Sequence, residues 1–289
     1  RMACDIEGIR PIRIHHVNLS ASVSTRNKRD LLLLLRETTM SNSKTIRIMT
    51  YNIHHGAGID GKVDMDRIAE VIARENADIV ALQEVDRDVK RSHRIDTMAR
   101  LSELTGMAHA FGKNIEYQGG DYGNGVLTRF PILQEKNLHY RMIRPREQRG
   151  LLQLVLEVCG QEVVLMNTHI DPHPDEAERL MHAEKIRATA WQYSPRPVIV
   201  CGDFNARPES KTIALMKADF VDVWELVGLG DGKTIPVSNP KKRIDYIFLS
   251  KGSQEVLKPI SSHVIYSEAS DHLPVIAEFH VKSHIMFYR

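Results

Sequence analysis

The chain has 289 residues, enough for one large domain or two small ones with a sizeable hydrophobic core. Its composition is that of an ordinary globular protein, and its 39 basic residues nearly balance its 37 acidic ones, for a net charge of +2. This balance excludes a general electrostatic attraction to nucleic acid or to anionic membranes, so any anion binding has to come from a local patch.

Residues 1–43 differ from the rest of the chain in their poor periodicity and in the polar stretch SASVSTRNKRD. We expect them to form an N-terminal extension, disordered or not native to the protein, before a domain over 44–282 and a C-terminal tail over 283–289. The leucine run at 31–35 is shorter than the roughly 7–15 apolar residues of a secretory signal, and no apolar run approaches the roughly 18 residues of a membrane span. Three cysteines far apart in the chain suit reduced thiols, so we expect a cytoplasmic protein without a transmembrane segment.

From residue 45 onward, short apolar runs alternate with segments of helical periodicity, without a linker or an internal repeat. Strands are expected at 45–53, 78–85, 124–132, 197–205, 243–250 and 273–281, and residues 151–170 are expected to form a hairpin about Gly160. Helices are expected at 64–77 with Asp64 as N-cap, at 96–106 with Gly106 as the end, and at 175–193 and 209–218. This alternation favours a single α/β domain.

Several of the expected strands lead into polar clusters rather than into ordinary turn residues. The residues concerned are Asn52, Gln83, Glu84, Asn167, Thr168, His169, Asp203, Asn205, Asp245, Asp271 and His272. In layered α/β proteins such residues can converge on one rim of the sheets. Four carboxylates meeting there would be costly to bury, and a hard divalent cation with oxygen ligands, Mg²⁺ or Mn²⁺, would remove that cost. The two histidines can bind an anion or transfer protons.

The other motifs and residue types of the sequence favour water as the nucleophile. No Ser or Cys stands beside a His in a nucleophile motif, and no glycine-rich phosphate loop is present, so metal-assisted attack of water on phosphorus is favoured over covalent catalysis. Two alternatives stay open. Asp203 and Asn205, taken alone, would suit an Asx turn. His169, Asp171 and His173 have the H-x-D-x-H spacing of a zinc site, although the intervening prolines stiffen it.

Seven motifs occur in order along the chain: TYNIHHG, ALQEVD, GNGVLTRFPI, NTHIDPH, CGDFNARP, RIDYIFLS and SDHLPV. Together they resemble the endonuclease/exonuclease/phosphatase superfamily, the DNase-I-like metal-dependent phosphohydrolases, over residues 45–279. The resemblance implies an α/β fold in four α-β-β-α layers, in which two mixed β-sheets pack face to face with helices outside.

The resemblance also implies binding residues. Glu84 matches the principal Mg²⁺ (or Mn²⁺) ligand, assisted by Asn52 and Asp271. Asn124 is implied to lie near the substrate. Arg149 adjoins an expected strand within the basic segment RMIRPREQRG, and we expect it to contact a phosphate ester.

Catalytic roles follow from the same resemblance. Asp203 matches the carboxylate that orients or deprotonates the attacking water, and Asn205 matches the amide that holds the water and the phosphate. His272 matches the histidine that contacts the scissile phosphate, and Asp245 matches the acid that fixes its tautomer. His169 matches a histidine that binds the phosphate or assists the leaving group.

The sequence departs from one branch of the superfamily. Two residues after Asn52, where the abasic endonucleases carry a second acid, stands His54, followed by His55. Inositol 5-phosphatases carry a WCDR-type stretch where this chain has KKRIDY, and aromatic residues make up only 6% of the chain. We therefore expect a Mg²⁺-dependent hydrolase of a small or lipid-like phosphate ester. A nuclease acting on DNA or RNA is the alternative, a non-catalytic binding module is a minor one, and the oligomeric state stays open.

Overall fold

The computed structural model describes residues 44–282, so the predicted N-terminal extension and C-terminal tail lie outside the described residues. Two mixed β-sheets of six strands each form its centre. The strands of the first sheet are β1 (Lys44–Asn52), β2 (Ile79–Arg87), β3 (Ala108–Tyr117), β4 (Gly120–Thr128), β11 (Leu257–Val264) and β12 (Val275–Val281). The strands of the second are β5 (Ile132–His139), β6 (Gly150–Val158), β7 (Gln161–His169), β8 (Val198–Asp203), β9 (Phe220–Asp222) and β10 (Asp245–Ser250).

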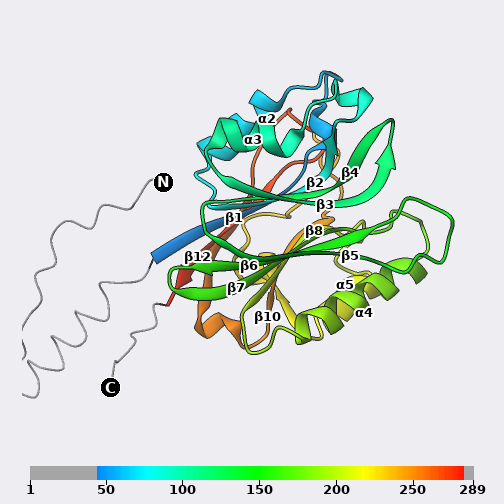
Figure 1. Cartoon of the computed structure of the whole chain (residues 1–289). Coiled ribbons are helices and arrows are strands. Elements are labelled where there is room, and N and C mark those ends of the chain that lie inside the picture. The colour runs from blue at the N-terminus through cyan, green and yellow to red at the C-terminus, as the bar shows by residue number, and fades with distance from the viewer. Residues whose placement is uncertain (1–43, 283–289) are drawn as a thin grey trace, which may run out of the picture. The chain divides into compact units, whose positions relative to one another are not determined.

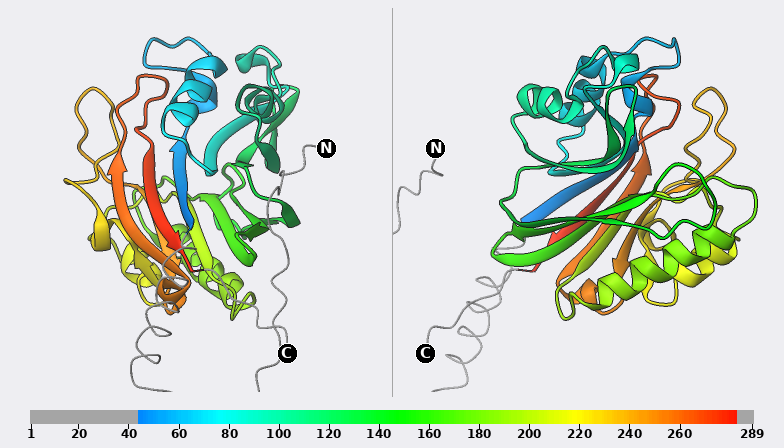
Figure 2. Two further views of the ribbon diagram at one scale, coloured as in Figure 1. Left: turned by 90° about the vertical axis from the view of Figure 1, so that its left-hand side faces the viewer. Right: turned by 45° about the vertical axis from the view of Figure 1, so that its right-hand side comes forward.

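Helices cover the outer faces of both sheets. They are α2 (Met65–Arg74), α3 (Thr97–Thr105), α4 (Ala177–Trp191) and α5 (Lys211–Met216). Helix α6 (Val223–Val227) instead contacts β11 of the first sheet and β10 of the second, and its Val223 belongs to the core between the sheets. Short 3₁₀ turns are η1 (His54–Gly56), η2 (Lys90–Ser92) and η3 (Ser253–Glu255). Figure 1 shows α2 and α3 over the first sheet and α4 and α5 over the second, and the right-hand view of Figure 2 shows the same order of layers. The predicted four-layer α-β-β-α sandwich is therefore confirmed.

Local sequence explains where the first helices begin and end. The Asp64 carboxylate accepts hydrogen bonds from the backbone N–H groups of Asp66 and Arg67, which caps α2 as predicted. The Asp96 carboxylate caps α3 in the same way, and Gly106 ends that helix in the left-handed conformation with φ 68°.

Each central strand is buried on both faces because helices and the opposite sheet sandwich it. In β1, Ile46 and Ile48 belong to the core between the two sheets, whereas Met49 and Tyr51 belong to the core under α2 and α3. A third core under α4 and α5 includes Phe204. Burial on two faces accounts for the nearly continuous apolar runs from which these strands were predicted.

Strand direction determines which ends meet at one rim. β1 is parallel to β2, and β7 is parallel to β8, so the carboxyl ends of these pairs lie together. β10 runs antiparallel to β8 with Asp245 opposite Asp203, and β12 runs antiparallel to β1 with Val275 opposite Thr50. Asp245 therefore begins its strand, and Asp271 lies in the loop before β12. The sequence pattern treated these residues as strand ends, and the antiparallel register is what brings them to the same rim.

Several strands and one helix were not predicted from the sequence. β3, β5, β9, β11 and α6 were not expected. β5 is an edge strand with mostly exposed or half-exposed side chains, so its sequence lacks the apolar pattern of the inner strands. Cys159 and Cys201 carry free thiols, as expected, and Cys4 lies outside the described residues. Within residues 44–282, none of the helices is both long and apolar enough to cross a membrane.

Candidate active site

A bulge in β2 turns Glu84 toward the rim. The register against β4 shifts between Leu82 and Val85, so Gln83 and Glu84 together lie opposite Asn124. Glu84 adopts a left-handed φ of 58°, which is uncommon for a residue with a side chain. The half-buried side chain of Glu84 therefore does not follow the regular alternation of side chains between the two faces of the sheet.

Asn52, the last residue of β1, connects two of the carboxylates. Its Nδ2 group donates to Glu84 Oε1 at 3.1 Å and to Asp203 Oδ2 at 3.2 Å. Its Oδ1 atom accepts from the backbone N–H of His54 at 3.1 Å. These three contacts assign the oxygen and the nitrogen of the Asn52 amide. In this orientation the amide donates hydrogen bonds to both carboxylates.

The end of β8 depends on a glycine. Gly202 has φ +153°, and a Cβ atom there would lie 2.0 Å from the carbonyl oxygen of Thr168 on β7. Asp203 follows, and its Oδ1 atom accepts from the backbone N–H of Asn205 at 2.8 Å. The Asx turn that we kept as an alternative is thus present, but it occupies only one carboxylate oxygen. Phe204 points into the core against Phe248, with ring centroids 5.2 Å apart.

The second oxygen of Asp203 faces the site. It lies 3.5 Å from His169 Nε2 and 3.8 Å from His272 Nε2. Burial, followed by the nearby charge of Asp245, raises the pKa of Asp203 to about 7. A carboxylate with its pKa near neutral pH suits proton transfer, because both of its protonation states are accessible there.

His272 is held between two carboxylates. Its Nδ1 atom lies 3.0 Å from Asp245 Oδ2, and the same oxygen accepts from the Thr234 hydroxyl. Burial opposes the charged form of the ring, but Asp245 and Asp203 outweigh it and raise the pKa of His272 to about 10. His272 is therefore an imidazolium at neutral pH, and its Nε2 side is directed at Asp203.

His169, at the end of β7, differs from His272 in charge. Burial, reinforced by the charges of Arg149 and His272, lowers the pKa of His169 well below its ordinary value. The neutral ring lies with Nε2 3.0 Å from Asn205 Nδ2, and Asn205 Nδ2 also donates to Ile170 O at 3.1 Å. With Nε2 as acceptor, the ring proton resides on Nδ1, which is buried without a hydrogen-bond partner among the described residues.

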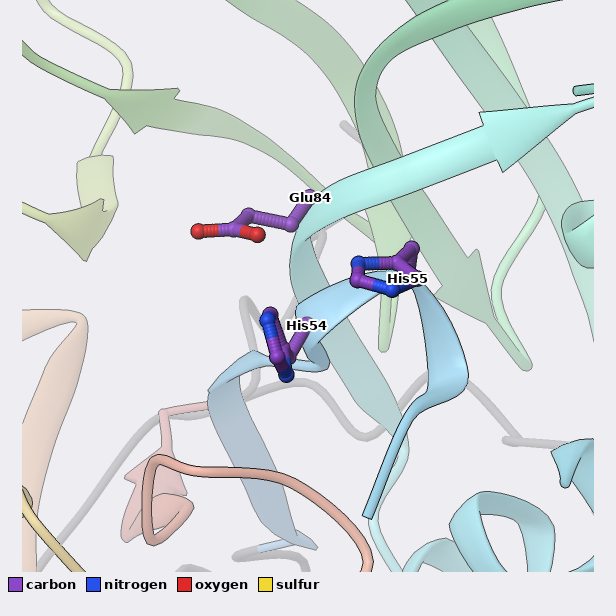
Figure 3. A group of neighbouring side chains, drawn as sticks. All are labelled: His54, His55 and Glu84. Carbon is purple, nitrogen blue, oxygen red and sulfur yellow. The ribbon is translucent and has the colours of Figure 1, made fainter. Parts of the chain in front are cut away.

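The two groups of possible metal ligands differ in part from the predicted set. Among residues 44–282, ligand atoms of three side chains lie within 4.8 Å of one another in two places, at His54, His55 and Glu84 and at Asp203, Asp245 and His272. Figure 3 shows the first group, in which Glu84 approaches from β2 and the histidines from the turn after β1. Asp271 joins neither group. Its half-exposed carboxylate lies 4.0 Å from His54 Nδ1.

Asn124 and Arg149, predicted to bind substrate, are both buried. Asn124 Nδ2 donates to the carbonyl of Gly150 at 3.3 Å, and Thr168 Oγ1 donates to the same carbonyl at 3.0 Å. Arg149 pairs with Glu147 at 2.8 Å, and its charge is among the causes that lower the pKa of His169. Arg149 is thus electrostatically coupled to the site, whereas Asn124 supports the strands beneath it.

The H-x-D-x-H alternative does not produce a metal site. His173 Nδ1 pairs with Asp175 Oδ2 at 2.8 Å, and Asp171 Oδ2 accepts from the backbone N–H of His173 at 3.2 Å. His169 is directed at Asn205. Within the described chain, the ligand atoms of this triplet do not form a group.

Sequence reasoning missed two supporting residues. Thr234, fully buried, donates to Asp245 from a loop, where a single threonine carries no signal in the sequence. Ser270, also buried, donates to the carbonyl of Asn52 at 2.7 Å and ties the loop of His272 to β1. Ser270 is the first letter of the SDHLPV motif, so the motif itself contained the signal.

Two polar residues of the predicted rim connect the sheets instead. Gln83 Nε2 donates to Asn167 Oδ1 at 2.7 Å, and Asn167 Nδ2 donates to the carbonyls of Leu82 and Gly125, each at 2.8 Å. These bonds satisfy buried polar groups and hold β2 and β7 together under the site.

The fold and the rim define a DNase-I-like protein with carboxylates, amides and histidines gathered where parallel strands end. Residues 49–272 match the model of the Endonuclease/Exonuclease/phosphatase family, and the chain belongs to this family. Members of the family are hydrolases that act on phosphate esters and are generally metal-dependent.

Similar proteins span the whole domain. A protein of Escherichia coli strain K12, YbhP, described as uncharacterized, is 27% identical over 252 residues, which cover 82% of this chain and 97% of that protein. The mannosyl-6-phosphatase Bt3783 of Bacteroides thetaiotaomicron has a similar structure, with a TM-score of 0.69 and 17% identity over 81% of this chain and 99% of that one. The human Nocturnin catalytic domain with bound sulfate gives a TM-score of 0.64 and 22% identity over 82% of this chain and 96% of that one.

Proposed function

We propose that this protein is a metal-dependent hydrolase of phosphate esters in which Asp203 activates the attacking water. The observation that carries the proposal is the environment of Asp203. One of its oxygens is fixed by the N–H of Asn205, and the other faces Asn52, His169 and His272. Donors for a phosphate and an acceptor for a proton are thus adjacent.

The side chains at the rim fit a divalent cation. Glu84 and Asp203 converge on one amide of Asn52, and Asp245 Oδ1 is buried without a hydrogen-bond partner among the described residues. Such oxygen donors suit Mg²⁺ or Mn²⁺. We propose Glu84 as the main ligand with Asn52 and Asp271 assisting, where Asn52 would turn its amide to offer its oxygen. A cation bound there would polarise the phosphoryl oxygens and acidify bound water.

The other residues of the site each have a separate role in the hydrolysis of the ester. Asp203 accepts the proton of the water as that water attacks phosphorus and the bond between phosphorus and the ester oxygen breaks. The alcohol leaves and takes up a proton from bulk water. The imidazolium of His272 donates a hydrogen bond to a phosphoryl oxygen, on which negative charge grows in the transition state. Asn205 Nδ2 would donate a second one by giving up one of its bonds, to His169 or to the carbonyl of Ile170. Asp245 keeps His272 protonated and oriented, since it accepts from Nδ1. His169, which is neutral, lies beside Asn205 and suits a contact with the phosphate or the leaving group.

Charge pairing favours a small or lipid-like ester over a long nucleic acid. Arg144 of the basic segment RMIRPREQRG pairs with Asp175 and with the buried Glu178, and Arg243 pairs with the buried Asp222, so the charges of these two arginines are neutralised. A protein that follows a nucleic-acid backbone needs a continuous row of free cations.

A substrate panel tests the proposal. The purified protein, supplied with Mg²⁺ or Mn²⁺, is assayed on bis-p-nitrophenyl phosphate, p-nitrophenyl phosphate, sugar monophosphates, sphingomyelin, short RNA and plasmid DNA. We expect turnover of the small or lipid-like esters that stops with EDTA. Dominant cleavage of plasmid DNA or RNA would establish the nuclease alternative instead. Failure to hydrolyse any phosphate ester would overturn the proposal and favour a binding module.

A further inference from the structure

Two consecutive histidines after β1 share an unusual backbone. His54 and His55 have φ values of 45° and 48°, and Glu84 across from them has a φ of 58°. A left-handed conformation costs roughly 1–2 kcal/mol for a residue with a Cβ atom. All three members of one side-chain group thus adopt a conformation that is uncommon in proteins.

The backbone turn gives the two imidazoles a common direction. Successive side chains of a strand point to opposite faces, but here the ring centroids of His54 and His55 lie 4.5 Å apart. The turn is fixed by hydrogen bonds from the N–H of His54 to Asn52 Oδ1 at 3.1 Å and from the N–H of Ala57 to His54 O at 2.8 Å. Figure 3 shows both rings on the side of the turn that faces Glu84.

Within residues 44–282, the Nδ1 atoms of the two rings make no hydrogen bond, and the nearest carboxylate oxygen to His54 Nδ1 is that of Asp271 at the long distance of 4.0 Å. Nδ1 of His54 and Nδ1 of His55 are both buried without a hydrogen bond among the described residues, although the side chains are in part exposed. A buried polar atom without a partner costs about 1–3 kcal/mol. One nitrogen of each ring and an oxygen of Glu84 lie within 4.8 Å of one another, so a single ion can contact all three side chains.

The positive charge of Arg91 acts on this group and is offset in part by Asp86. Arg91 acts on His55 electrostatically, but its guanidinium is held by the buried Asp86 through two bonds, Nε to Oδ2 at 2.9 Å and Nη2 to Oδ1 at 2.8 Å. The bidentate pair offsets part of the charge of the arginine next to the group. The only carboxylate of the group itself is that of Glu84.

We propose that His54, His55 and Glu84 bind a transition-metal ion through two imidazole nitrogens and one carboxylate oxygen. Imidazole is a good ligand for transition metals such as Zn²⁺, and Mn²⁺ accepts it beside oxygen ligands, whereas Mg²⁺ prefers oxygen ligands alone and keeps its water. The site therefore selects a transition metal over Mg²⁺. The inference rests on the proposed function only in that Glu84 belongs to both. The other proposed ligands of the ion bound by Glu84 are then nitrogen atoms of His54 and His55, in place of the oxygen ligands that the sequence predicted.

Asparagine variants test the ligands with little disturbance of the turn, because Asn tolerates a left-handed backbone better than most residues. The full-length protein is stripped with EDTA, exchanged into buffer and loaded with Mn²⁺ alone. Electron spin-echo envelope modulation then reports ¹⁴N nuclei coordinated to Mn²⁺. We expect imidazole modulation in the wild type, a weaker signal in His54→Asn and in His55→Asn, and none in the double variant.

Calorimetric titration supplies a second readout. Mn²⁺ should bind the wild type at least about 100-fold more tightly than Mg²⁺, and the double variant should lose about tenfold or more of its Mn²⁺ affinity. His109→Asn, at an exposed position of β3, is the matched control and should leave both measurements unchanged. Circular dichroism verifies that each variant is folded.

The outcomes separate this inference from the proposed function. Mn²⁺ that binds without ¹⁴N modulation, equal affinities for Mn²⁺ and Mg²⁺, or an unchanged signal in the double variant would each overturn the inference. An enzyme that hydrolyses esters with an oxygen-bound ion would leave the proposed function standing. A nitrogen-bound ion in a protein that hydrolyses no phosphate ester would leave the metal site and refute the function.

Discussion

Asp245 controls the charge of His272, and the replacement Asp245→Asn tests this directly. Asn keeps the shape of the side chain but removes the negative charge that lies 3.0 Å from His272 Nδ1. In the wild type the carboxylates raise the pKa of His272 to about 10, although burial opposes the charged ring. The variant leaves burial unchanged and removes the strongest partner of the imidazolium.

The size of the effect follows from that contact. A hydrogen bond to a charged group contributes about 1.5–3 kcal/mol, and one pKa unit corresponds to about 1.4 kcal/mol. The lost hydrogen bond alone lowers the pKa of His272 by about one to two units, and the lost Coulomb attraction lowers it further. Because Asp203 remains nearby, we expect the pKa of His272 in Asp245→Asn to fall by about two units or more, from about 10 to about 8 or below.

The measurement is an NMR titration of ¹³C-labelled histidine side chains in EDTA. His272→Gln assigns the signal among the 14 histidines of the chain. Asp66→Asn, at an exposed position in the first turn of α2, serves as the matched control and should not move the His272 titration. A pKa in Asp245→Asn equal to that of the wild type would refute the reasoning, because Asp245 could then not be the cause of the raised value.

Two further predictions concern the support of the site. Glu178 is buried and accepts from the N–H of Ile143 at 2.9 Å, and such bonds hold the pKa of Glu178 below its usual range despite burial. Glu178→Gln should therefore lower the free energy of unfolding by about 1.5–3 kcal/mol at pH 7. This difference from the wild type should shrink as the pH falls below about 4, because Glu178 then becomes protonated. Urea denaturation that gives the same difference at pH 7 and below pH 4 would contradict this prediction. Gly202→Ala should destabilise by about 1–3 kcal/mol more than Gly160→Ala, because the added Cβ at Gly202 would meet Thr168 O at 2.0 Å. At Gly160 a Cβ meets nothing within 4 Å, and only the left-handed φ of 81° is strained, so equal melting temperatures of the two variants would argue against this account.

The fold was largely predictable because most of the central strands are buried on two faces. Their apolar runs and the caps at Asp64 and Gly106 indicated the main elements, and the order of seven motifs indicated the layers. The edge strand β5 was missed because its exposed side chains carry no apolar period. The three-residue strand β9 and the five-residue helix α6 are too short to show a period in the sequence.

The sequence indicated which residues to expect at the candidate site, but not how their side chains are arranged. The sequence singled out Asp203 and His272, yet the left-handed turn at His54 and His55 and the bulge at Glu84 arise from strand register and hydrogen bonds. These backbone features bring imidazoles to Glu84, where the sequence pattern had indicated oxygen ligands alone. A long-range pairing of this kind leaves no periodic signal in a single sequence.

The most direct test of the central claim is the turnover of Asp203→Asn on the best substrate of the panel. Asn preserves the shape of the side chain and removes the proton acceptor. We predict that kcat falls by a factor of about 10²–10⁴ at pH 7.5 in the presence of Mn²⁺, while the melting temperature and the affinity for Mn²⁺ stay close to those of the wild type. Turnover close to that of the wild type in this variant would contradict the assignment of Asp203 as the residue that activates water.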